Sequence, residues 1–112
     1  MGEEADPYRV DEAKILDYLL NADHPEGRSK AGFFMAMGFA SHNWEDLRRA
    51  LLRAPIHGVQ VDTETTRYGD KAVFIHEIHG PNGVNRLVRT VWFRASSDVG
   101  WRLVSAYPDR KP

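Results

Sequence analysis

Four polar side chains lie within seven residues, in a loop that leads into an apolar segment: His24, Arg28, Ser29 and Lys30. The segment that follows, residues 30–37, is apolar nearly all round and is typical of a short buried helix. A helix N-terminus attracts anions, because its first N–H groups have no intrahelical partner and carry partial positive charge. Lys30 adds a full charge. The sequence therefore indicates an anion site here; the alternative is an ordinary helix capped by Ser29 with solvated bases nearby.

Two hydroxyl groups occur close together near the C-terminus, at Ser105 and Tyr107. Residues 101–107 are typical of a strand, in which side chains two residues apart point to the same face. Ser105 and Tyr107 are thus predicted to share a face, where they could hold a phosphate group or orient a base. The alternative is a strand end at which Tyr107 packs at the rim of the sheet.

The strand predicted before it, residues 84–95, contains an arginine among apolar side chains. Alternation places Arg89 on one face and Thr90 on the other. Because a half-buried arginine needs a partner, Arg89 either pairs with a carboxylate or lines a cleft. Antiparallel pairing with the last strand is expected to bring Arg89 or Thr90 close to Ser105.

A histidine motif, His76-Glu77-Ile78-His79, is similar to the zinc-protease signature but is one residue short. On a strand, His76 and His79 point to opposite faces, so they cannot share a metal as helical histidines four residues apart do. The chain also has no cysteine. We therefore predict no metal site and no cofactor; His79 with Glu77, or His57, is either a base or a plain surface residue.

The elements that position these residues change in type near residue 59. Helical spacing of apolar residues predicts helices over residues 10–21 and 30–37 and a third that starts at Asn43 or Ser41 and ends at Pro55. Strict alternation then predicts strands over residues 59–64, 72–79, 84–95 and 101–107, joined by short turns. The larger apolar side chains of the helices should be buried: Leu16, Phe33, Phe34, Leu47 and Leu51.

These elements predict an α+β fold in which three N-terminal helices pack on one face of a four-stranded antiparallel meander. Residues 1–9 are expected to form a flexible arm and residues 10–112 a single domain, since the 112 residues of the chain leave little room for a second core. The start is acidic: residues 1–25 hold seven acids and two bases, whereas the remainder holds nine and thirteen. No apolar run resembles a signal peptide or a membrane span, so we expect a cytoplasmic protein; an effector exported by a dedicated machine would look the same.

The following motifs together resemble a bacterial domain family of unknown function: His24-Pro25-x-Gly27-x-Ser29-Lys30-Ala31-x-Phe33-Phe34-x-x-x-Gly38-Phe39, then Tyr68-Gly69, Thr90-Val91-Trp92 and Arg102-Leu103-Val104-Ser105-Ala106-Tyr107-Pro108. The match covers residues 8–108. That family occurs alone or at the C-terminus of larger secreted, toxin-like proteins. Its layout is similar to that of the barnase–EndoU–colicin–RelE class of metal-independent RNases.

The resemblance implies a toxin-type domain that cleaves RNA by general acid/base chemistry, with a small antitoxin or immunity protein as partner. It implies catalytic roles for His24, Lys30, Arg89, Ser105 and Tyr107, and substrate contacts for Arg28, Ser29 and Thr90. At position 105 the family more often has threonine, a change that keeps the hydroxyl. The alternative is a non-catalytic binding module of the immunity or adaptor type, which the near-neutral charge and three tryptophans would suit. A polar cleft beside Ser105 would favour catalysis, and a shallow apolar patch would favour binding.

Overall fold

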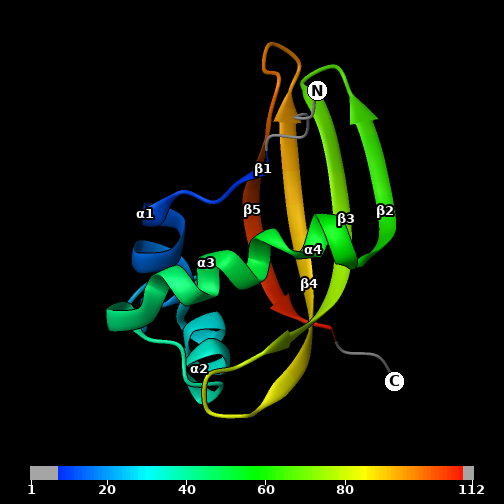
Figure 1. The fold of residues 1–112 in the computed structure, drawn as a ribbon. Coiled ribbons are helices and arrows are strands. Elements are labelled where there is room, and N and C mark those ends of the chain that lie inside the picture. The colour runs from blue at the N-terminus through cyan, green and yellow to red at the C-terminus, as the bar shows by residue number, and fades with distance from the viewer. Residues whose placement is uncertain (1–7, 110–112) are drawn as a thin grey trace.

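A computed structural model describes residues 8–109 of the chain. Within them the elements follow in the order β1 (Tyr8–Arg9), α1 (Glu12–Lys14), the π-helical turn η1 (Ile15–Leu19), α2 (Arg28–Ala36), the 3₁₀ turn η2 (Ser41–Asn43), α3 (Trp44–Leu52), α4 (Ala54–His57), β2 (Val59–Thr66), β3 (Gly69–His79), β4 (Asn85–Ala95) and β5 (Trp101–Pro108). The strands form one sheet in the order β1-β5-β4-β3-β2 (Figure 1). The predicted α+β class is confirmed.

The sheet has one strand more than the predicted four-stranded antiparallel meander. β2, β3, β4 and β5 are antiparallel neighbours, as expected, but β1 pairs in parallel with β5, so the sheet is mixed. The prediction of strands only after Pro55 was therefore wrong. Tyr8 lies opposite Trp101, and its ring packs edge-on against Trp92 with centroids 5.3 Å apart. Contacts with residues far along the chain stabilise this two-residue strand, and no local alternation could indicate them.

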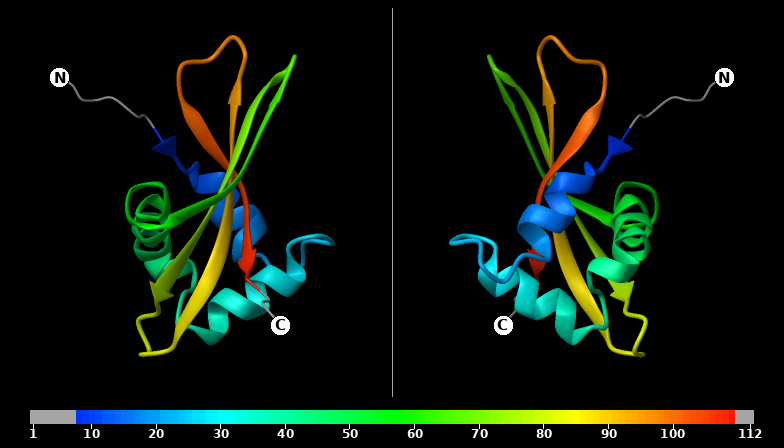
Figure 2. Two further views of the ribbon diagram at one scale, coloured as in Figure 1. Left: turned by 90° about the vertical axis from the view of Figure 1, so that its right-hand side faces the viewer. Right: turned by 90° about the vertical axis from the view of Figure 1, so that its left-hand side faces the viewer.

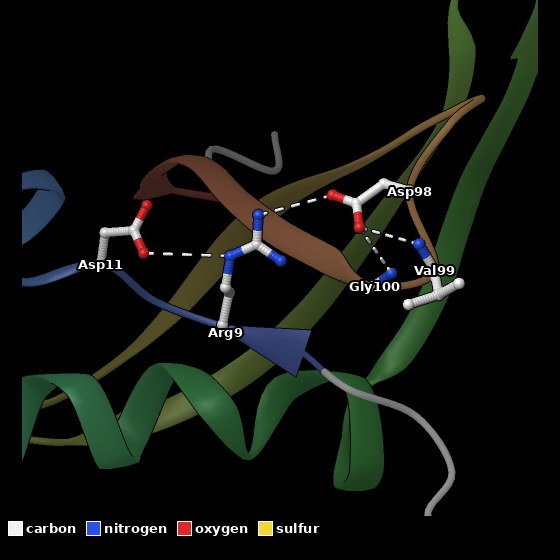
Figure 3. Close-up of polar contacts among 5 residues, drawn as sticks. All are labelled: Arg9, Asp11, Asp98, Val99 and Gly100. Carbon is white, nitrogen blue, oxygen red and sulfur yellow. Dashed lines mark hydrogen bonds and ion pairs between the residues drawn. The ribbon is translucent and has the colours of Figure 1, made fainter.

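Of the arm predicted for residues 1–9, Tyr8 and Arg9 form β1, and residues 1–7 lie outside the described part of the chain. Arg9 follows Tyr8 and reaches Asp98 in the β4–β5 turn, with Nη2 3.5 Å from Oδ2 (Figure 3). The other carboxylate oxygen of Asp98 accepts hydrogen bonds from the backbone N–H groups of Gly100 and Val99. These two donors, and then Arg9, lower the pKa of Asp98. β1 is thereby tied to the turn beside it.

The first and third predicted helices are interrupted. The first is a single turn, α1, that continues as the π-helical turn η1, where the N–H of Leu20 donates to the carbonyl of Ile15 at 2.8 Å. Pro55 does not end the helical region, as was predicted, but lies in the first turn of α4, where a proline costs no hydrogen bond. Helices therefore extend to His57. None of the helices within residues 8–109 has the length and apolar character needed to cross a membrane.

The helices do not all cover one face of the sheet, which corrects the predicted layering. α3 and α4 lie on one side, whereas α2 crosses the lower end of the sheet to the other side (Figure 2). The core lies between the sheet and these helices and includes Phe34, Leu47 and Leu51, all fully buried as predicted. Leu16 and Phe33 are only half-buried, since each is at the border of the helical layer.

β2 was predicted to be half-buried, but every residue of it is exposed. It forms the free edge of the sheet beyond the helices, at the right of Figure 1. The exposed fractions of Val59 and Val61 are 67% and 43%, so the alternating residues 59–64 have no layer to pack against. Alternation correctly indicated a strand here, but it did not indicate burial.

β5 contains an irregularity that the predicted alternation did not include. Val91 lies opposite Ser105, but the next residue of β4, Trp92, lies opposite Leu103, so Val104 is an extra residue. The bulge separates Leu103, which is buried beside Trp92, from Ser105, which belongs to the other face. Trp101 and Leu103 were predicted to share a face with Ser105 and Tyr107, and that grouping was wrong. The bulge places Tyr107 on the same face as Arg89.

Candidate functional site

A cleft of about 470 Å³ lies where the start of α2 meets the lower ends of β4 and β5. We call it the lysine cleft, and it is lined by Ser29, Lys30, Phe33, Arg89, Tyr107, Pro108 and Asp109. Four of these were predicted site residues: two from the helix start and two from the strands. They come from distant parts of the sequence. The fold therefore brings together residues that had been predicted to share a site only because of their chemical types.

The sheet supplies one wall of the lysine cleft through a single pair of facing residues. Arg89 of β4 lies directly opposite Tyr107 of β5, and the bulge at Val104 sets this register. Side chains that face each other on antiparallel strands have Cβ atoms about 5 Å apart. The guanidinium and the phenol can therefore both contact one small ligand.

The start of α2 supplies the other wall. Its N-cap residue is Gly27 and not Ser29, which was predicted as the cap. Ser29 is the second residue of α2 and lines the cleft. Lys30 is half-buried; its Nζ donates to the carbonyl of Glu26 at 3.3 Å and lies 5.5 Å from the ring centre of Tyr18. Among residues 8–109 no carboxylate forms an ion pair with Lys30, so its charge is available to an anion.

Arg89 has the carboxylate partner that its half-buried position requires, and the partner is Asp109. Nη2 of Arg89 donates to Oδ1 of Asp109 at 3.1 Å; the side chain of Arg89 is 32% exposed and that of Asp109 only 3%. Oδ2 of Asp109 is buried and has no hydrogen-bond partner among residues 8–109. A buried oxygen of this kind is costly unless a ligand or water binds it. Sequence reasoning missed Asp109, although its place directly after the strand that carries Tyr107 was a usable signal.

Tyr18, which the sequence reading treated only as a flanking residue of the first helix, connects several predicted site residues. Its hydroxyl lies 3.3 Å from Oγ of Ser105, and its ring packs edge-on against His24 with centroids 5.1 Å apart. The same ring is approached by Nζ of Lys30, and Nζ of Lys14 lies 4.9 Å from its centre. Tyr18 therefore orients His24, Lys30 and Ser105 with one side chain.

His24 organises the loop before α2. Its Nδ1 accepts hydrogen bonds from the backbone N–H groups of Glu26 and Gly27, both at 3.0 Å. A neutral ring with Nδ1 as acceptor carries its proton on Nε2. Nε2 is therefore a hydrogen-bond donor, and the acceptor nitrogen of the ring is occupied by the loop backbone.

Four predicted site residues do not line the lysine cleft, and the first of them is His24, in the loop before α2. Ser105 is half-buried beside it and contacts Tyr18, and Arg28 is an exposed residue in the first turn of α2. Thr90 is fully buried: its hydroxyl donates to the carbonyl of Phe74 at 3.3 Å and accepts from the indole N–H of Trp92 at 2.8 Å. Thr90 cannot contact a substrate in this position, because the helix-covered face of the sheet surrounds it.

The fold has a relative among solved structures. It is similar to a chain of the "Contact-dependent growth inhibition toxin - immunity protein complex from Klebsiella pneumoniae 342", with a TM-score of 0.73 over 91% of this chain and 93% of that one. The two sequences are 18% identical, so the likeness establishes a common fold. No curated protein sequence matches the chain significantly.

At the level of sequence, one family model covers almost the whole molecule, including both walls of the lysine cleft. It is described as "Domain of unknown function (DUF6883)" and matches residues 2–110. The chain belongs to this family.

Proposed function

We propose that the chain is a toxin-type domain that cleaves RNA without a metal ion, and that the lysine cleft is its active site. The observation that carries the proposal is the convergence of Lys30, from the helix start, with Arg89 and Tyr107, from the sheet, in a single polar cleft. Cations and hydroxyl groups are the donors that bind a phosphodiester. A shallow apolar surface at this place would have favoured a binding module instead.

RNA supplies its own nucleophile, so the protein needs only proton transfer and charge. The 2′-oxygen attacks the neighbouring phosphorus and forms a cyclic phosphate, while the bond from phosphorus to the 5′-oxygen breaks. A base takes the proton of the 2′-hydroxyl, and an acid gives a proton to the departing 5′-oxygen. Lys30 and Arg89 stabilise the negative charge that develops on the phosphorane oxygens, and Ser29 and Tyr107 donate hydrogen bonds to the phosphate.

Two groups are candidates for the proton transfer. His24 presents Nε2 and is held against Tyr18, above whose ring Lys30 also lies. Asp109 lines the cleft and has a buried oxygen with no partner among residues 8–109. We assign the transfer to Asp109, because its carboxylate lines the cleft, whereas the ring nitrogen of His24 that could accept a proton already accepts two backbone hydrogen bonds. Asp109→Asn should then lower cleavage about 100-fold, whereas His24→Gln should lower it far less; the reverse result would move the role to His24.

A protein partner is part of the proposal. The solved relative is a chain of a toxin–immunity complex, which supports a role for this chain in a toxin system with a small inhibitory partner. The same likeness is compatible with an immunity-type binding module. One observation favours that second candidate: β2 is an exposed edge strand with two exposed valines, and such edges bind other proteins by strand addition.

Controlled expression in bacteria and cleavage of total RNA by the purified chain test the proposal. We expect growth arrest and RNA cleavage that persists in EDTA. Lys30→Ala should reduce cleavage about 100-fold, and so should Arg89→Lys, which keeps the charge but loses the planar fork. Arg102→Ala is the matched control, since Arg102 is an exposed arginine at the opposite end of β5 and contacts the ring of Phe93. Intact RNA with folded wild-type protein, or equal effects of Lys30→Ala and Arg102→Ala, would contradict the proposal.

A further inference from the structure

A second cleft, of about 450 Å³, lies on the other side of the sheet, where α4 meets the lower half of β3. We call it the histidine cleft. The side chains that give it its character are Arg53, His57, His76, Glu77 and His79, with Ala50 and Ile78 as its apolar floor. None of these residues takes part in the proposed RNA-cleavage site. The sequence predicted no metal site for His76 and His79, and it left His79 with Glu77, or His57, as either a base or a plain surface residue.

The histidine cleft lies where the pairing between β2 and β3 ends. The pairing of β2 with β3 begins where Val59 meets Ile75, so residues 76–79 of β3 have no strand beside them on that edge. α4 occupies this place instead, and Gly58 lets it approach closely. A Cβ atom at Gly58 would lie 2.6 Å from the carbonyl oxygen of Ala54 and 2.7 Å from that of Ile75. The close approach brings His57, at the end of α4, to His76.

The charge of the histidine cleft is predominantly basic. Arg53, at the junction of α3 and α4, and His57 face His76 from the helical side, and His79 and Glu77 face it from β3. Glu77 is the one acidic residue of the lining, and it pairs with His79, with Oε1 3.6 Å from Nε2. The helical side of the cleft thus contributes an arginine and a histidine, Arg53 and His57, and no carboxylate.

The effect of this arrangement is visible in the pKa of His76. Burial lowers it most, and the neighbouring His57 and Arg53 lower it further, with a smaller contribution from His79; only Glu77 raises it. The half-buried His76 is therefore held close to the exposed Arg53 and His57, and its protonation is disfavoured there. A bound anion would relieve this cost. Among residues 8–109, no three His, Asp or Glu side chains converge in the way that metal ligands do.

We propose that the histidine cleft binds a phosphate group, with Arg53 as the permanent cation and His57 and His76 as ligands that strengthen binding as they become protonated. An arginine can bind two phosphate oxygens with its planar fork, and a protonated imidazole donates charge-assisted hydrogen bonds from either nitrogen. The site does not depend on RNA cleavage in the lysine cleft. His76 lies opposite Val88 and Arg89 lies opposite Ile75, so His76 and Arg89 point to opposite faces of the sheet.

The phosphate group could belong to a nucleic-acid backbone or to free phosphate, and two probes distinguish these sources. Dimethyl phosphate represents a backbone diester and keeps a single charge between pH 5 and 8, and inorganic phosphate represents the free ion. Each is titrated into the labelled full chain at constant ionic strength, and the amide and histidine signals are followed by NMR. Binding of both probes indicates a backbone site, and binding of inorganic phosphate alone indicates a site for the free ion.

We expect the signals of His57, Gly58 and His76 to shift, with dissociation constants about tenfold lower at pH 5.5 than at pH 8. His57→Ala and Arg53→Gln, both at exposed positions, should weaken binding about tenfold. Glu77→Gln should strengthen it, because it removes the only carboxylate of the lining, and Arg67→Ala, an exposed position in the β2–β3 turn at the opposite end of β3, should have no effect. The proposal is overturned if neither probe shifts these signals, or if His57→Ala and Arg53→Gln leave binding unchanged. RNA cleavage is not involved in either outcome.

Discussion

The lysine cleft and the histidine cleft lie on opposite faces of one sheet and hold positive charge in different ways. In the lysine cleft the cations are Lys30 and Arg89, and the buried carboxylate of Asp109 pairs with Arg89. The histidine cleft instead combines Arg53 with histidines, and burial and the neighbouring His57 and Arg53 lower the pKa of His76. The first site has fixed charge with a counter-charge in place, and the second gains charge as the pH falls.

The difference follows from how each cleft is built. The lysine cleft depends on the register of β4 and β5, where the bulge at Val104 sets Tyr107 opposite Arg89. The histidine cleft depends on a close approach of backbone to backbone, which Gly58 permits. Rigid strand pairing suits a site in which the positions of reacting groups matter, whereas an edge closed by a short helix suits binding of a small ion. The predictions that follow separate the two clefts, in order of decreasing effect.

The largest expected effect is that a substitution in one cleft impairs the function of that cleft and leaves the function of the other cleft unchanged. Lys30→Ala should lower RNA cleavage about 100-fold and leave phosphate binding in the histidine cleft unchanged. His57→Ala should do the reverse, with binding weakened about tenfold and cleavage unchanged. Parallel assays of both variants measure this. Loss of both functions in either folded variant would show that the two clefts are one coupled site.

Gly58→Ala should destabilise the protein by roughly 2–3 kcal/mol, because both of the nearest atoms to the new methyl group are backbone oxygens that cannot move aside without shifting α4 or β3. It should also weaken phosphate binding, since His57 moves with α4. Urea unfolding gives the stability, and the NMR titration gives the binding. RNA cleavage per folded molecule should stay unchanged, and its loss would contradict the independence of the lysine cleft.

These residues also indicate what the sequence could and could not predict. The period-two alternation after residue 59 located four strands and their turns, and the polar residues of the α2 loop and of β4 and β5 were correctly chosen as neighbours of one site. Alternation is local, so it could not reveal that residues 59–64 of β2 have no layer to pack against, or that Val104 is an extra residue. Both depend on where other elements end.

The connecting residues were missed for the same reason. Tyr18 was read as a flank of the first helix, and its link to His24, Lys30 and Ser105 exists only when η1 packs beside β5. Thr90 was chosen for its hydroxyl, but the strand face that it shares with Trp92 is the one that the helices cover. Tyr8 pairs with β5 through contacts almost the whole chain apart. Residue type predicted the chemistry well, and tertiary packing decided which residues could carry it out.

Gly32→Ala is the matched counterpart of Gly58→Ala on the other cleft. Gly32 lies in the middle of α2, and a Cβ atom there would meet nothing within 4 Å. The substitution should therefore stabilise the protein by about 0.5–1 kcal/mol, because alanine loses less backbone entropy in a helix than glycine does. Urea unfolding measures the gain. A loss of stability would mean that α2 is not helical at this position. The placement of Lys30 in the lysine cleft would then be wrong.

The smallest expected effect is a two-step dependence of stability on pH. The pKa of His76 is lowered in the folded chain from its ordinary value of 6.5, so its contribution to stability is complete above pH 6.5 and is lost as the pH falls through the folded pKa. The pKa of Asp98 is lowered from 3.8 by Gly100, Val99 and Arg9, so its contribution is lost only below pH 3.8. The free energy of unfolding, measured in urea from pH 8 to pH 3, should fall in these two separate windows.

His76→Gln should remove the upper step alone. Asp98→Asn should reduce the lower step, and dimethyl phosphate should shrink the upper one, because it stabilises the protonated histidines. A single step below pH 4 that His76→Gln does not alter would show that the histidine cleft does not gain charge in the range where the proposal requires it.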